Sequence, residues 1–242
     1  MLARRSQSVP EGRGVVCHTY HCPPAGTWTF FYAELDSVVE GVAVIARRAA
    51  EMMADASTAL VYADVRIAEW VISGDGELQA MCDELDQRCS KLLLLQAPVA
   101  ADLRVIITAM RAVGDLGRMV HLAQHIAKIA RLKHPRVLIP DDIRSILTQM
   151  SMRAVSLAQD AAAAIESRDQ LSGERLAQTD DEIDALRRQL FPILFSQEWS
   201  HGVELAVDAA LIGRYYERFA DHAVTIAGQV SQLPSHGLSP QR

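Results

Sequence analysis

Aromatic residues and positive charge are both scarce in this chain of 242 residues, and each scarcity excludes a class of protein. Only 5% of the residues are aromatic although 50% are hydrophobic, so aliphatic residues supply most of the apolar surface. Ala and unbranched long side chains lose the least freedom on entering a helix, which favours helices over sheets. The formal net charge of −6 argues against sequence-independent binding of nucleic acid, which requires a basic footprint.

Long apolar runs and nucleotide-binding or hydrolytic motifs are missing as well. No run approaches the roughly 18–20 residues that span a membrane, and Arg4 and Arg5 are not followed by the apolar stretch of a secretory signal. We therefore expect a cytoplasmic protein that meets membranes only indirectly, through its partners. The absence of a P-loop, a G-x-G-x-x-G segment, a nucleophile elbow and an H-E-x-x-H motif favours a protein that is not an enzyme.

The four cysteines fall into two groups. Cys82 and Cys89 belong to an apolar stripe at helical spacing, which predicts buried core thiols. The segment Cys17-His18-Thr19-Tyr20-His21-Cys22 has the side chains of a zinc knuckle. Four ligands so close in one chain rarely close a tetrahedron without a turn, and we favour a disordered or untranslated extension.

Apolar residues recur at three- and four-residue steps along almost the whole chain, which predicts six amphipathic helices. The first is expected over 32–72, with a break near Tyr62 to Asp64. A second carries the stripe from Leu78 to Leu92, and a third extends from Pro98 to Leu132. The remaining three are expected from Asp141 or Asp142 onward, over 172–195 and over 199–233.

Long, short and long helices thus occur twice, which indicates an internal duplication. Residues 116–127 align with 216–227 at an offset of 100, and 75–80 align with 180–185. The predicted fold is all-α: two tandem three-helix bundles packed side by side, over 31–134 and 141–233. Residues 1–30 are expected to form a disordered extension and residues 234–242 a disordered tail.

A carboxylate stands on the inward stripe of the last predicted helix. Glu217 follows Ala210 and Gly213 on that stripe, and Asp221 lies one turn further on the same face. An unpaired buried carboxylate is costly, so Glu217 needs a partner. Either an arginine such as Arg214 or Arg218 pairs with it, or the two carboxylates supply oxygen ligands to a cation.

The segment around Glu217 and Asp221 resembles the E-x-x-x-D signature of PhoU-type proteins. The resemblance includes Leu94-Leu95-Gln96-Ala97-Pro98, the segment 125–128 and Trp199-Ser200-His201, and it covers about 31–233. It implies a non-catalytic regulator with iron or zinc at E-x-x-x-D surfaces. The implied partners are a phosphate ABC transporter, through its ATPase subunit, and a sensor histidine kinase, whose activities it damps when phosphate is plentiful. Whether the chain forms a homodimer stays open.

The first repeat departs from this signature. Gly117 replaces the Glu and His121 replaces the Asp, so a first metal site should be lost or altered. His121 and His125 form an H-x-x-x-H pair that could chelate zinc or iron, or lie exposed on the helix without a ligand. Helix geometry adds Asp184 and Asp208 as further candidate ligands. The alternative functions are a carboxylate-bridged metalloenzyme and a metal-free helical interaction module.

Overall fold

The computed structural model describes residues 25–96, 100–135, 139–167 and 173–231. Within these ranges the chain forms seven helices and no strand. The helices are α1 (Ala25–Tyr62), α2 (Val65–Ser73), α3 (Asp75–Gln96), α4 (Ala100–Lys133), α5 (Asp141–Ser167), α6 (Gly173–Leu194) and α7 (Val203–Ser231).

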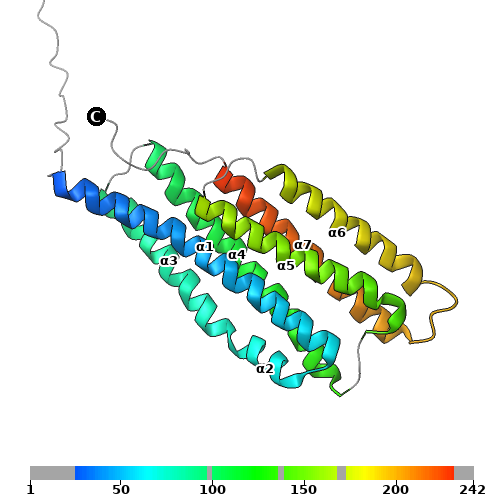
Figure 1. The fold of residues 1–242 in the computed structure, drawn as a ribbon. Helices are drawn as coiled ribbons and strands as arrows, with labels where there is room; N and C mark the ends of the chain where they lie inside the picture. Colours follow the sequence, from blue (N-terminus) through cyan, green and yellow to red (C-terminus); the bar gives the residue numbers. More distant parts are fainter. Residues whose placement is uncertain (1–24, 97–99, 136–138, 168–172, 232–242) are drawn as a thin grey trace, which may run out of the picture.

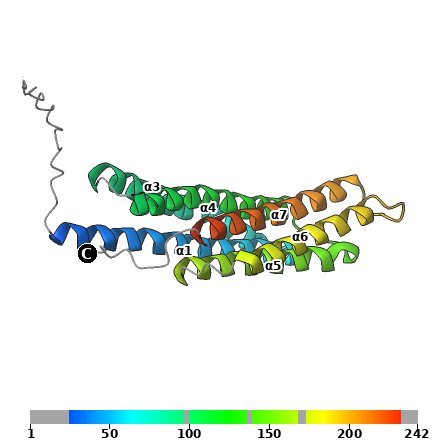
Figure 2. The same ribbon diagram turned by 90° about the horizontal axis from the view of Figure 1, so that it is seen from above.

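Four long helices form the centre of the molecule. α1 packs on α4 and α5, and α7 packs on the same two helices, so the four close into a ring. α2 and α3 cover α1 and α4 on one flank, and α6 covers α5 and α7 on the other (Figures 1 and 2). The first bundle therefore contains α1 to α4 and the second contains α5 to α7. This confirms the predicted all-α fold of two repeated helical bundles.

The predicted break after the first long helix is real and explains the seventh helix. Ala63 adopts a positive φ of 51°, which ends the helix. This left-handed conformation costs free energy in a residue other than glycine. Asp64 then caps α2, because its side chain accepts hydrogen bonds from the backbone N–H groups of Arg66 and Ile67. The N-cap restarts the helix at a new angle instead of letting it continue to residue 72.

Two helix starts differ from the sequence-based expectation. α1 begins at Ala25, so the residues just before 31 are helical; the Cys17–Cys22 segment and the tail 234–242 lie outside the described residues. α7 begins at Val203 and not at Trp199, because Gly202 takes a φ of 84° that a helix does not contain. The indole of Trp199 donates to the Gly202 carbonyl at 2.9 Å, which fixes this turn.

The hydrophobic core is rich in alanine and extends through both repeats. Across the ring of central helices, the Tyr216 hydroxyl of α7 donates to Ser57 Oγ of α1 at 2.9 Å, and both residues are buried. Cys82 and Cys89 are buried free thiols, as predicted, and burial raises the pKa of each to about 11. Within the described ranges, no helix is long and apolar enough to cross a membrane.

Candidate functional site

Glu217 lies in the second half of α7 and is almost completely buried, at 8% exposure. Its carboxylate accepts from Arg214 Nη1, which lies 2.5 Å from both Oε1 and Oε2. Arg187 approaches from α6, with its Nε 3.7 Å from Oε2. The structure thus gives Glu217 the ion-pair partner that its burial requires. Arg214 was one of the two arginines expected from the sequence, and Arg187 was not expected.

Carboxylates from α6 face those of α7. The pKa of Asp180 rises to about 6 because of burial, and then because of the negative charges of Asp221, Asp184, Asp181 and Glu217. We call Asp180, Asp184, Glu217 and Asp221 the acidic cluster. Asp180 is the member that sequence reasoning missed. Its spacing of four residues from Asp184 was the available signal, because it places both carboxylates on one helical face.

The donor chemistry of the acidic cluster suits a metal ion. Carboxylate oxygens bind hard divalent cations and also serve zinc and iron. Among the residues that the structure describes, however, no three His, Cys, Asp or Glu side chains stand together as metal ligands do. The Glu217 oxygens are held by Arg214 instead. A metal that used Glu217 as a ligand would therefore share this carboxylate with Arg214 or displace it.

Asp208 has a different role in the structure. Its Oδ2 lies 2.9 Å from Lys133 Nζ, and Glu204 contacts the same ammonium group. Lys133 is the last residue of α4, so the contact ties the two repeats together. Asp208 precedes Glu217 by nine residues, or about 14 Å along a helix. It is therefore an ion-pair partner in the structure and lies apart from the acidic cluster.

The corresponding place in the first repeat is an open groove of about 560 Å³ between α3 and α4. A Cβ added at Gly117 would meet only the Gln79 side chain, at 3.8 Å. His121 is exposed, and its Nδ1 lies 2.7 Å from the Gly117 carbonyl. His125 instead stacks on Tyr215 of α7 with ring centroids 5.2 Å apart. The two imidazoles thus have separate partners, and no third ligand joins them within the described ranges.

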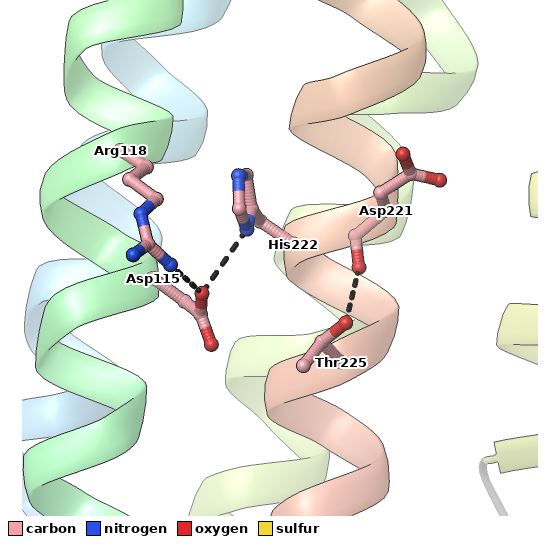
Figure 3. A network of polar contacts seen from close by, with 5 residues as sticks. All are labelled: Asp115, Arg118, Asp221, His222 and Thr225. Atoms are coloured by element: carbon pink, nitrogen blue, oxygen red, sulfur yellow. Dashed lines mark hydrogen bonds and ion pairs between the residues drawn. The ribbon is translucent and has the colours of Figure 1, made fainter.

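A polar network links the two repeats beside the acidic cluster. His222 Nδ1 lies 3.1 Å from Asp115 Oδ1 of α4, and Arg118 donates to the same oxygen at 3.0 Å. Burial lowers the pKa of His222 and outweighs the opposing pull of Asp115. Figure 3 shows the Asp221 side chain pointing away from this network. Two adjacent residues of α7 thus face different neighbours: Asp221 faces the carboxylates of α6, and His222 contacts α4 of the first repeat.

The family of the chain follows from both repeats together. The model of the PhoU domain matches residues 42–130 and again 147–230. The chain belongs to the PhoU family. The two matched segments fall on the two bundles, so the duplication seen in the sequence is a duplication of the PhoU domain.

Named members of the PhoU family and one solved structure extend this result. "Phosphate-specific transport system accessory protein PhoU homolog 2" of Mycobacterium tuberculosis is 39% identical over 202 residues, covering 84% of this chain and 95% of that protein. Homolog 1 of Mycobacterium leprae is 38% identical over 202 residues, covering 84% of this chain and 91% of that one. The crystal structure of PhoU from Pseudomonas aeruginosa superposes with a TM-score of 0.76 at 26% identity, covering 84% and 98% of the two chains. PhoU proteins carry names of accessory proteins, not enzymes, which supports the expectation that this chain is not an enzyme.

Proposed function

We propose that this protein is a negative regulator of phosphate uptake and of phosphate-starvation signalling. Membership of the PhoU family supports an accessory role in phosphate transport, because the relatives that match nearly their whole length are named for that system. The observation that carries the proposal is the double match of the PhoU domain over both bundles. We place the protein in the cytoplasm, where it works without turnover.

The regulator would act as an adaptor between two partners. One is the ATPase subunit of a phosphate ABC transporter, and the other is a sensor histidine kinase; the sequence resemblance supports both. The helices of the described residues give the molecule several exposed faces, and contact with these partners would bring it to the membrane indirectly. The proposal does not depend on whether the chain forms a homodimer.

We further propose that the regulator binds a metal ion, iron or zinc, at the acidic cluster. Glu217 and Asp221 would be ligands, with Asp184 and Asp180 of α6 on the facing helix. The raised pKa of Asp180 supports the proposal in part, because burial causes most of the shift and repulsion from the neighbouring carboxylates adds to it. A bound cation would neutralise this repulsion and stabilise the ionised form of each carboxylate. His121, His125 and Asp208 are not part of this proposed site.

The function is tested in cells and the metal site on the purified protein. Cells that lack this protein and any paralogue should keep high phosphate uptake and express starvation genes in phosphate-rich medium, and the restored gene should reverse both effects. Unchanged phosphate handling in those cells would refute the regulatory role.

Asp221→Ala should lower the metal content of the purified protein at unchanged helicity. The matched control is Asp160→Ala, which removes an exposed carboxylate of α5; equal metal content in both variants would refute the site.

A further inference from the structure

The groove of about 560 Å³ between α3 and α4 is apolar inside and acidic along one side. Cys82 and Val113 are buried within it, and Met110 is half-buried beside them. Asp83 and Asp86 line the α3 side, and neither forms an ion pair within the described ranges. A groove with an apolar interior and a charged edge suits an amphipathic helix of the opposite charge.

Two glycines open this groove on its α4 side. A Cβ added at Gly114 would meet no atom within 4 Å, and one at Gly117 would meet only Gln79, at 3.8 Å. Gly213 of α7, in contrast, leaves room for Leu190, which lies 3.1 Å from its Cβ position. Glycine destabilises a helix interior relative to alanine. Packing inside the described chain does not require it at 114 or 117, so both positions leave α4 open to close approach from outside.

The outer face of α4 is basic, although the whole chain has a net charge of −6. α4 contains six basic residues and two acidic ones, and both acidic residues, Asp102 and Asp115, are buried. Arg111 is exposed and has no ion-pair partner among the residues that the structure describes. Ile107 precedes it by about one turn and is 38% exposed. α4 thus presents to solvent a basic and partly apolar face, which complements the acidic groove beside it.

The basic face and the acidic wall stand at the same level of the molecule. Gln79 of α3 lies beside Gly117 of α4. Asp86, seven residues later on α3, lines the groove together with Met110, seven residues earlier on α4. The two helices therefore run antiparallel, and Arg111 is level with Asp86. A second copy related by a two-fold axis parallel to these helices keeps this level, so each Arg111 approaches Asp86 of the other copy.

We propose that the chain forms a symmetric dimer in which α4 of each copy lies in the groove between α3 and α4 of the other. Gly114 and Gly117 let the two α4 helices approach closely. Ile107 supplies apolar contact, and Arg111 pairs with Asp86 of the other copy. Each contact occurs twice, because a two-fold interface uses the same surface of both copies. The dimer rests neither on the proposed regulatory role nor on the proposed metal site.

A second copy suits this surface better than an anionic membrane does. A lipid surface of one charge would attract the cations of α4 but repel Asp83 and Asp86 beside them. A second copy brings both signs of charge, and the symmetry places each sign opposite its complement. The charge pattern of this surface is thus complementary to itself.

Sedimentation equilibrium of the purified full chain, in a buffer with a chelator, measures the dimer. We expect a monomer–dimer equilibrium whose Kd rises with salt, because salt screens charge pairs at the rim of an interface. Gly114→Leu places a side chain in the groove and should raise the Kd at least about 10-fold. It should not lower the melting temperature, since leucine is a better helix former than glycine. Ala163→Leu is the control, because it adds the same side chain at an exposed position of α5 and should leave the Kd unchanged.

Mixing two charge reversals tests the pairing between copies. Arg111→Glu alone and Asp86→Lys alone each place like charges together at both symmetric contacts. Each should therefore raise the dimer Kd about 10-fold or more. An equimolar mixture of the two variants should form heterodimers with a Kd near that of the parent protein, because opposite charges then meet at both contacts. An effect within one chain cannot produce this recovery.

The outcomes separate the dimer from its interface. A parent protein that stays monomeric up to about 0.1 mM refutes the dimer. A dimer that neither Gly114→Leu nor the charge reversals weaken refutes this interface. A mixture that stays as monomeric as its helical components refutes the pairing of Arg111 with Asp86. Should Gly114→Leu lose helicity, the mixing experiment decides alone. The phenotype of cells that lack the protein tests the regulatory role separately, whatever the oligomeric state.

Discussion

The acidic cluster should reduce the stability of the metal-free protein, and Asp180 provides the most direct test. Asp180→Asn removes one negative charge at nearly constant volume from a carboxyl whose pKa rises from 3.8 to about 6 in the fold. That difference corresponds to roughly 3 kcal/mol at about 1.4 kcal/mol per pKa unit. Because the carboxyl keeps part of its contact with water, screening reduces the effect, and we expect the variant to be more stable by about 1 kcal/mol.

The gain in stability should depend on pH with a defined sign. A carboxyl with a raised pKa binds protons more readily in the folded state than in the unfolded state. Its relative stabilisation is therefore complete below pH 3.8 and is lost as the pH rises through about 6. Asp180→Asn should thus exceed the parent protein in stability above about pH 6 and match it below 3.8.

Urea unfolding in the presence of a chelator measures this difference, since a bound metal would reverse it by stabilising the parent protein. Asp160→Asn is the control, because it removes an exposed carboxylate of α5 and should change stability little at either pH. The reasoning would be refuted by a gain of equal size at both pH values, or by a loss of stability above pH 6.

Two further predictions concern the backbone and the contact between the repeats. Gly114→Ala should stabilise the protein by about 0.5–1 kcal/mol, because α4 leaves open space at its Cβ position; Gly202→Ala should destabilise it by about 1–2 kcal/mol, because φ there is 84°. Urea unfolding of both variants checks this, and effects of the same sign would contradict it. His222, whose pKa is lowered from 6.5 by burial, should make stability fall as the pH drops below 6.5. Unfolding of His222→Asn should show a shallower slope over that window, and an unchanged slope would assign it to another group.

The helices could be predicted because their signal is local. Apolar residues at three- and four-residue spacing define most of the helices. The break at Tyr62 to Asp64 is also local, because Asp64 is the N-cap residue of the next helix. The start of α7 could not be predicted in the same way. Trp199 extends the apolar pattern of α7 toward the N-terminus, so the sequence pattern places the start of the helix too early. Only the positive φ of Gly202 shows that the helix begins later.

The site was predictable only along a single helix. The inward position of Glu217 indicated that it needs a partner, and Arg214 was available one turn away. Arg187 and Asp180 lie on α6 and reach the same place only because of the register between α6 and α7. Helical periodicity contains no information on that register, since it depends on how side chains from both helices interlock. For the same reason the pairing of His222 with Asp115 became visible only in the structure.

The seam between the repeats has a consequence for the origin of the fold. Tyr216 of the second bundle donates to Ser57 of the first, and the four central helices close one common core. A single repeat would leave half of that core in water, which a bundle of this size tolerates poorly. An ancestor with one repeat would therefore have existed as a pair of identical chains.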